Sequence, residues 1–184
     1  MVVFDLVVGI LSTILAFFAI VIRDSGREWL LIQRRNPDKN FHGKQDFTCA
    51  AAGMVSATRD RRSEELDVYA TACNELREEA GVRVREDQVV FLALLRETNL
   101  REVGLVAEVE VQASPATLIG PHADSFESKG FLLCEATPEA FADFLSRNLP
   151  VERFAPLSAG AILFSLLRRF SRERIESAFG RLKA

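Results

Sequence analysis

The apolar residues near the start of the chain form two short runs separated by a polar break. Residues 14–23 and 28–34 are rich in Val, Ile, Leu and Phe, and Asp24, Ser25 and Gly26 stand between them. Aspartate, serine and glycine favour tight turns, and apolar runs of this length and composition are typical of strands. We therefore predict a β-hairpin in this part of the chain.

Four later segments also have the composition of strands. Two of them, residues 89–96 and 103–111, are joined by a short segment with turn-forming residues, and AEVEV at positions 107–111 alternates with a period of two. Such alternation is typical of a strand with one buried face. We expect these two strands to pair antiparallel, and we expect further short strands at residues 47–54 and 129–134.

A helix is predicted immediately after Asp67. Asp67 is a suitable N-cap, Ala72 and Leu76 follow at helical spacing, and Gly81 is suited to end the helix. The segment before it, residues 56–63, is charged and has no apolar periodicity. We expect that segment to be a solvent-exposed insertion outside the core.

Three more helices are expected towards the C-terminus. Thr137 as N-cap and Pro138 at the first helical position open one that ends near Asn148, and residues 158–170 and 172–182 are amphipathic. A basic cluster lies along the last two. We interpret it as a solvated helix face, with anion binding as the alternative; its members are Arg168, Arg169, Arg172 and Arg174.

Length and charge restrict the class of protein. With 184 residues, 48% of them hydrophobic, the chain can build one core, so residues 1–184 are expected to form a single domain. The net charge of -3 provides no positive field for a nucleic-acid polymer. The three cysteines are widely spaced and include no CxxC pair, which argues against disulfides and zinc and favours the cytoplasm.

The apolar run at residues 6–22 allows two interpretations. It is uncharged and close to the lower limit for crossing a bilayer, but Asp5 stands where a secretory signal would carry positive charge. Its Val, Ile and Phe content is typical of buried strands. We expect buried strand structure, in which residues 1–13 form an extra N-terminal strand. This apolar run could also be the surface of a homodimer. The alternative is that residues 1–13 belong to a membrane segment.

Three glutamates of the predicted helix point to metal chemistry. Glu75, Glu78 and Glu79 are three and four positions apart, so their carboxylates share one helix face and repel each other by ~0.2 to 0.5 kcal/mol per pair. Oxygen ligands on a rigid element suit a hard cation such as Mg²⁺. An ordinary solvated acidic face is the alternative.

Residues 53–82 resemble the Nudix box, G-x5-E-x7-R-E-U-x-E-E-x-G-U, where U is aliphatic. Positions 75–82 of the chain satisfy eight consecutive positions of that motif. The order of predicted elements over residues 14–148 is also similar to that of the family. The resemblance implies an α/β/α sandwich with a mixed sheet, to which residues 157–184 would add C-terminal helices.

The first half of the motif departs from the family pattern. Gly53 and Asn74 are 21 positions apart where the motif has 14, so seven extra residues precede the helix. Counted back from the helix, the first glutamate of the motif falls on Leu66 and its arginine on Asn74. Both partners of a Glu–Arg pair are therefore expected to be absent, unless Glu64 or Glu65 reaches back from the insertion.

The resemblance also implies a function. A Nudix-type diphosphohydrolase would cleave a nucleotide-like small molecule with Mg²⁺, or Mn²⁺, held by the three glutamates of the helix, with Glu78 and Glu127 as catalytic residues. Gly53 would contact the substrate. The guanidinium groups of Arg34 and Arg35 suit phosphate oxygens and would contact it as well, with an ordinary solvated surface as the alternative for the arginines. The alternative is a Nudix-like domain that binds a nucleotide or a partner without turnover.

Overall fold

The computed structural model describes residues 14–36, 47–56, 59–62, 65–98, 102–118, 128–148 and 154–180. The strands are β1 (Ile14–Asp24), β2 (Arg27–Arg35), β3 (Phe47–Cys49), β4 (Ala51–Met54), β5 (Arg61–Arg62), β6 (Glu65–Leu66), β7 (Val89–Glu97), β8 (Glu102–Gln112) and β9 (Ser128–Glu135). The helices are α2 (Val68–Ala80), η2 (Glu86–Gln88), α3 (Pro115–Leu118), α4 (Pro138–Asn148), α5 (Pro156–Leu167) and α6 (Arg172–Gly180).

Seven strands form one mixed sheet with β1 at its centre. Its main path runs β3-β2-β1-β8-β7, while β4 pairs with β1 and β9 pairs with β2. β1 is parallel to β8 and antiparallel to β2 and β4. The predicted antiparallel pair of β7 and β8 is confirmed, and so is the hairpin of β1 and β2.

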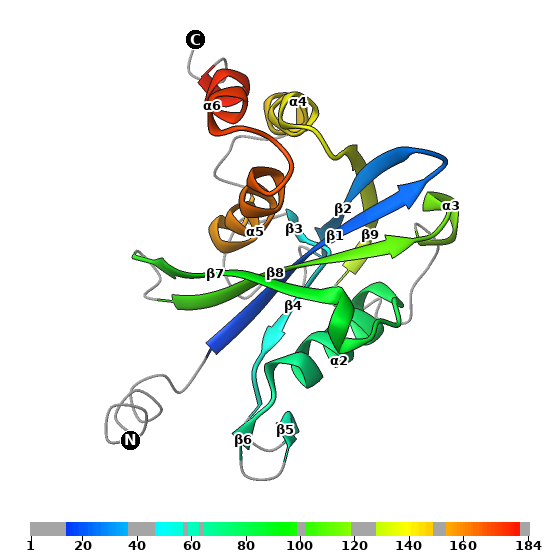
Figure 1. Cartoon of the computed structure of the whole chain (residues 1–184), viewed down its shortest axis with the longest axis vertical. Coiled ribbons are helices and arrows are strands. Elements are labelled where there is room, and N and C mark those ends of the chain that lie inside the picture. Colours follow the sequence, from blue (N-terminus) through cyan, green and yellow to red (C-terminus); the bar gives the residue numbers. More distant parts are fainter. Residues whose placement is uncertain are drawn as a thin grey trace.

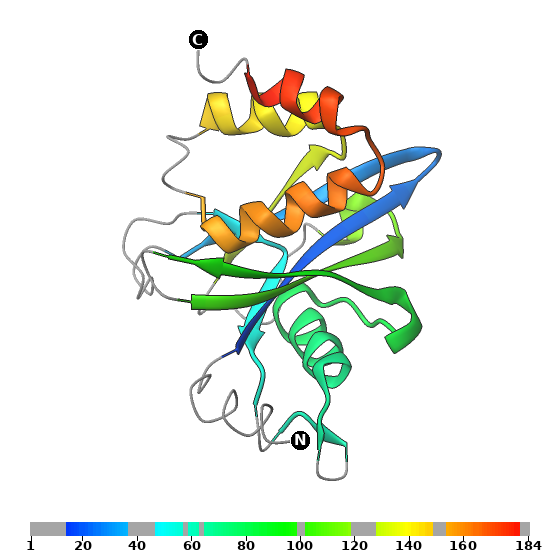
Figure 2. The same cartoon turned by 60° about the vertical axis from the view of Figure 1, so that its left-hand side comes forward.

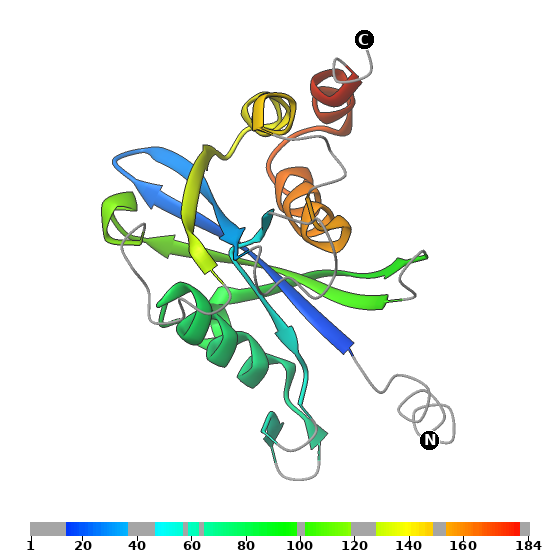
Figure 3. The same ribbon diagram turned by 180° about the vertical axis from the view of Figure 1, so that it is seen from behind.

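Helices cover both faces of the sheet. Figures 1 and 3 show α2 on one side of the strands and α5 on the other. In Figure 2, α4 and α6 lie side by side beyond α5, and these two helices contact each other. The expected α/β sandwich with additional C-terminal helices is therefore confirmed.

β1 is apolar from residue 15 to residue 22 because both of its faces are buried there. Phe17 and Val21 belong to the core beneath α4, α5 and α6, whereas Phe18 and Ile20 belong to the core beneath α2. A strand with two buried faces reads as a continuous apolar run, since alternate side chains enter different cores. This accounts for the apolar run from position 14 to position 22.

The structure tests the membrane interpretation of residues 6–22 only for positions 14–22. Positions 14–22 lie in β1, as predicted for a buried strand, while residues 1–13 lie outside the described part of the chain. Among the helices that the structure describes, none is both long enough and apolar enough to cross a bilayer.

Local signals placed the turn and the helix ends correctly. Ser25 and Gly26 have positive φ angles of 51° and 80°, which a two-residue hairpin turn requires. Asp67 caps α2 by accepting hydrogen bonds from two backbone N–H groups, and Gly81 ends the helix in the left-handed conformation with a φ of 66°. Thr137 caps α4 by accepting from the N–H of Ala140 at 3.2 Å.

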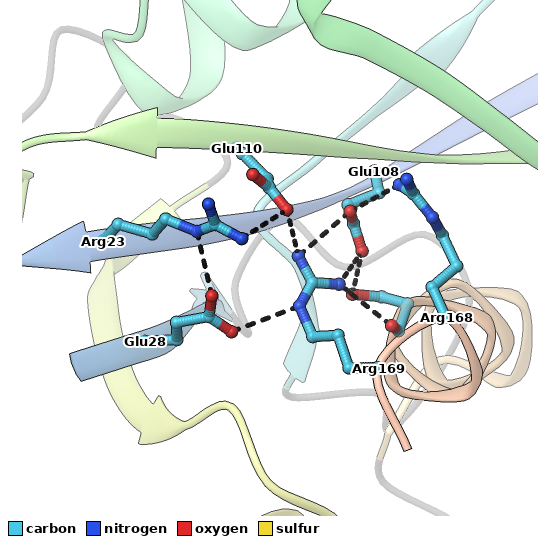
Figure 4. Close-up of polar contacts among 7 residues, drawn as sticks. Arg23, Glu28, Glu108, Glu110, Arg168 and Arg169 are labelled. Atoms are coloured by element: carbon cyan, nitrogen blue, oxygen red, sulfur yellow. Dashed lines mark hydrogen bonds and ion pairs between the residues drawn. The ribbon is translucent and has the colours of Figure 1, made fainter. Parts of the chain in front are cut away.

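The interpretation of the basic cluster as a solvated face is wrong for Arg169. Its side chain is 12% exposed and pairs with Glu28 of β2 and with Glu108 and Glu110 of β8. Glu108 is buried and also accepts from Arg168 and Ser165 (Figure 4). Arg23 of β1 pairs with Glu28 and Glu110, so this ion-pair network joins the residues that follow α5 to β1, β2 and β8.

Candidate functional site

α2 packs on β4, and this contact brings Glu75 over Gly53. The side chain of Glu75 lies so close to Gly53 that a Cβ there would approach the carboxyl carbon to well under 3.0 Å. Glu75 is 8% exposed. The glycine at the start of the predicted motif therefore makes room for the first of the three carboxylates.

Glu79 connects the same helix to the sheet through hydrogen bonds. Its Oε2 accepts a hydrogen bond from the backbone N–H of Ala52 at 3.1 Å and one from Nε2 of Gln33 at 3.5 Å. Gln33 lies in β2 and is buried. Glu79 thus links α2 to both β4 and β2, while the apolar side of the helix, with Ala72 and Leu76, enters the core as predicted.

The segment before α2 contributes to this site, and the prediction that it is solvent-exposed is wrong for Asp60, although Arg59 and Arg62 are exposed. Asp60 has no exposed surface. Its carboxylate accepts from the N–H of Ser56 and from Oγ1 of Thr71, both at 2.9 Å, and from Nδ2 of Asn74 at 3.3 Å. The small hairpin of β5 and β6 follows directly.

Asn74, which stands at the position of the motif arginine, contacts Asp60. The neutral amide of Asn74 donates to the buried carboxylate of Asp60, so a hydrogen bond connects α2 to the segment that precedes it. Leu66, which backward counting assigned to the motif glutamate, is exposed on β6, as is Glu65, while Glu64 lies outside the described residues. With Leu66 and Asn74 at the two motif positions, the contact of Asn74 with Asp60 stands in place of a Glu–Arg pair.

Hydrogen bonds outweigh burial at Asp60. Burial alone would raise the pKa of this carboxyl, but donation from Arg59, Ser56, Thr71 and Asn74 holds the pKa below its usual value. Asp60 is consequently ionised at neutral pH, which strengthens each of these hydrogen bonds.

Arg59 lies among three carboxylates. Its Nε donates to Oδ1 of Asp60 at 3.0 Å, and its Nη2 donates to Oε1 of Glu75 at 2.5 Å. Nη1 is 3.7 Å from Oε2 of Glu78. The hydrogen bonds that Arg59 donates to Asp60 and Glu75 raise its pKa above the usual value, so the guanidinium remains charged.

The carboxylates of α2 have different surroundings. Burial raises the pKa of Glu75 above its usual value, and the hydrogen bond from Arg59 opposes this effect only in part. Glu78 is half-exposed, and besides Arg59 it has Arg77 at 3.5 Å. The predicted set of three glutamates therefore divides into a buried residue beside a guanidinium, a residue bound to the backbone of β4, and a residue facing solvent.

The oxygen donors suit a divalent cation, but protein groups hold them in this arrangement. Glu75 and Glu78 lie one turn apart on one helix, and the absent side chain of Gly53 leaves space for the carboxylate of Glu75. In the residues that the structure describes, however, no three His, Cys, Asp or Glu side chains converge as metal ligands. The cation beside Glu75 and Glu78 is the guanidinium of Arg59.

Of the remaining predicted site residues, the structure describes Arg34 and Arg35. Arg34 is exposed at the end of β2, and Gln33 is the β2 side chain that contacts Glu79. Arg35 is half-buried next to a bulge between the two arginines. Glu127 lies outside the described residues.

Three residues of the site were not recognised in the sequence, namely Gln33, Arg59 and Asp60. A signal existed for the last two, because counting forward from Gly53 instead of backward from the helix places the motif glutamate at Arg59, next to Asp60. No comparable signal marks Gln33, whose role depends on where β2 meets α2.

Comparison with known proteins identifies the fold. The sequence matches no protein-family model and no curated protein. Similar solved structures include the Nudix domain of Shewanella oneidensis NrtR complexed with ADP ribose, at 14% identity and a TM-score of 0.58, covering 85% of this chain and 88% of that one.

Two further solved structures have a similar fold. The MutT/nudix family protein from Enterococcus faecalis is 11% identical with a TM-score of 0.52, and the match covers 67% of this chain but only 43% of that longer one. The T. brucei MERS1–GDP complex is 14% identical with a TM-score of 0.55, covering 84% and 60%. The chain thus has the Nudix fold, which confirms the resemblance seen in residues 53–82.

Proposed function

We propose that the chain binds a nucleotide-like small molecule with a diphosphate group and hydrolyses the diphosphate with Mg²⁺ or Mn²⁺. The observation that carries this proposal is the contact of Glu75 with Gly53. A buried carboxylate costs folding free energy, and a glycine that makes room for it weakens its strand. A buried glutamate over a glycine is therefore expected where the carboxylate has a chemical role.

Each glutamate of α2 has a role in this proposal. Glu75 and Glu78 would hold the metal, and Glu79 would complete the set or keep the helix in register through Ala52. The metal would neutralise phosphate charge and activate water. Glu78 is accessible to solvent and could also orient that water, while Glu127 remains the predicted second catalytic residue.

Recognition of the substrate is proposed at the edge of the same site. Arg34 and Arg35 would meet phosphate oxygens from the end of β2, and Gly53 would lie next to the bound diphosphate. Similarity of fold to an ADP-ribose complex and a GDP complex supports nucleoside diphosphates as the first compounds to test. A small molecule is favoured over a nucleic-acid polymer because the net charge is -3.

The test is release of phosphorylated products from a panel of compounds in the presence of Mg²⁺ or Mn²⁺. The panel contains nucleoside diphosphate sugars, ADP-ribose, dinucleoside polyphosphates and nucleoside triphosphates, with an RNA oligonucleotide for comparison. Glu78→Gln should abolish the turnover, and Glu176→Gln, an exposed helical glutamate on α6, should not change it. Unchanged turnover in Glu78→Gln would reject the catalytic assignment.

The second candidate function is nucleotide binding without turnover. Two observations favour it: Arg59 contacts Glu75 directly, and the position of the motif arginine is occupied by Asn74, which donates to Asp60. Calorimetry with ADP-ribose and GDP separates the candidates. Binding that leaves both compounds intact in the presence of metal supports this second function, whereas product formation supports the first.

A further inference from the structure

We infer that the guanidinium of Arg59 is the resident cation of the α2 carboxylate site, and that a divalent metal enters only when Arg59 leaves Glu75. This inference rests on the proposed metal site and adds a competitor for it that comes from the chain itself. It also assigns a role to the charged segment before α2, because residues 56–63 include Arg59.

The contacts of Arg59 support the inference that a metal ion replaces its guanidinium. Its Nη2 occupies the Oε1 side of Glu75 at 2.5 Å, and its Nη1 faces Oε2 of Glu78 at 3.7 Å. A metal bridging these two carboxylates would have to occupy the space that the guanidinium fills. Because like charges repel strongly at short range where water is partly excluded, both cations cannot occupy it together.

Arg59 also has an anchor that does not depend on Glu75. Its Nε and Nη2 donate to the two carboxylate oxygens of Asp60 at 3.0 and 3.3 Å. Asp60 is buried and held by Thr71 and Asn74. The side chain can therefore release Glu75 while Asp60 keeps its charge compensated, and 42% of the Arg59 side chain is already exposed to solvent.

The guanidinium also explains how the site is tolerated without metal. Three glutamates lie within two turns of one helix, and Glu75 is buried. Arg59 supplies the positive charge that offsets their repulsion. The same charge lowers the affinity of the site for a second cation, so the free energy of metal binding is reduced by the contacts that must be broken.

The first experiment compares Mn²⁺ affinities of the full chain by electron paramagnetic resonance. Arg59→Gln should bind Mn²⁺ about tenfold more tightly than the wild type, or more, since it removes a charge from between two carboxylates. Arg77→Gln is the matched control, because Arg77 contacts Glu78 at 3.5 Å from the exposed surface and does not contact Glu75. Its affinity should change less than about threefold.

The second experiment uses the wild-type protein and is independent of how Arg59→Gln folds. Mg²⁺ is titrated while the Nε–H resonance of Arg59 is followed by nuclear magnetic resonance, with the Nε–H of Arg85, which pairs with Asp87 on the surface, as the reference. If the metal displaces Arg59 from Glu75, the Arg59 resonance should show a saturable shift and the Arg85 resonance should not. Metal binding that leaves the Arg59 resonance unchanged overturns the inference.

The outcomes separate this inference from the proposed function. If the wild type binds Mn²⁺ and hydrolyses a diphosphate but Arg59→Gln binds no more tightly, the inference fails and the function stands. Equal gains in Arg59→Gln and Arg77→Gln also overturn it, since net charge alone would explain them. Binding by Arg59→Gln but not by the wild type supports the inference and rejects hydrolysis; no binding by either rejects both.

Discussion

Glu75 of α2 lies over Gly53 of β4 so closely that the strand has no room for a side chain at that position. The two residues are 22 positions apart in the sequence and belong to different layers of the fold. Their contact sets the depth at which the helix approaches the sheet, and with it the position of the whole acidic face.

Gly53→Ala is expected to move Glu75 away from the sheet. The added methyl group would overlap the carboxyl group, and overpacking of this kind costs about 1–3 kcal/mol of unfolding free energy. Urea denaturation measures the loss. Gly180→Ala is the control, because a Cβ on Gly180 meets nothing within 4 Å, and it should leave stability unchanged or slightly raised. Equal stability of the two variants would contradict the contact.

Asp60→Ala should destabilise the protein by about 2–4 kcal/mol, because it removes a buried acceptor that serves Thr71 and Asn74. Asp60→Asn should lose less, since its carbonyl oxygen can still accept. The control is Asp143→Ala, an exposed helical pair with Arg147, with an expected loss below about 0.5 kcal/mol. If Asp60→Ala and Asp143→Ala unfold at the same urea concentration, Asp60 has no structural role.

Arg169→Met should cost about 3–5 kcal/mol, because Glu108 stays buried after losing its main partner. Replacing both residues, as Arg169→Met with Glu108→Gln, should recover part of that loss, since no uncompensated charge is then buried. Thermal unfolding of the single and double variants tests this. Arg172→Ala, which breaks an exposed pair with Glu176, is the control and should be nearly neutral.

The buried thiols predict a loss of stability in alkaline solution. Burial raises the pKa of Cys49 from 9.0 to about 11 and that of Cys134 to about 12. The unfolded chain releases these protons from pH 9 upward while the folded chain retains them. The stabilisation is therefore complete below pH 9 and is lost as the pH rises to about 11 and 12 respectively.

The measurement is urea unfolding at pH 7.5 and pH 10. Each buried thiol should contribute roughly 1 kcal/mol to the loss at pH 10. Cys49→Ser removes one of these titrations, so its stability should fall less between the two pH values than that of the wild type. An identical fall in both proteins would contradict the raised pKa of Cys49.

Sequence patterns predicted the long strands and the longer helices of this fold because their determinants are local. The turn at Ser25 and Gly26 and the caps at Asp67 and Gly81 depend on residues within one or two turns of the chain. The three glutamates of α2 were found for the same reason, since their spacing and the helix that carries them can be read from adjacent residues.

Two predictions were wrong where a charged side chain meets a distant part of the chain. Residues 56–63 were expected outside the core, yet Asp60 is buried, and Arg169 was assigned to a solvated face, yet it pairs with three glutamates. A charged residue is most often exposed, and the exceptions depend on partners that lie far away in the sequence.

The sequence by itself determined the long strands of the sheet, helix α2, the C-terminal helices, the caps and the row of carboxylates on α2, because propensity, periodicity and capping act between neighbouring residues. Only the tertiary structure decided what surrounds those carboxylates: Gly53 beneath Glu75, Gln33 beside Glu79, and Arg59 between Glu75 and Glu78. Burial and ion pairing depend on which distant segments the folded sheet brings together, and the spacing of residues along the chain does not contain that information.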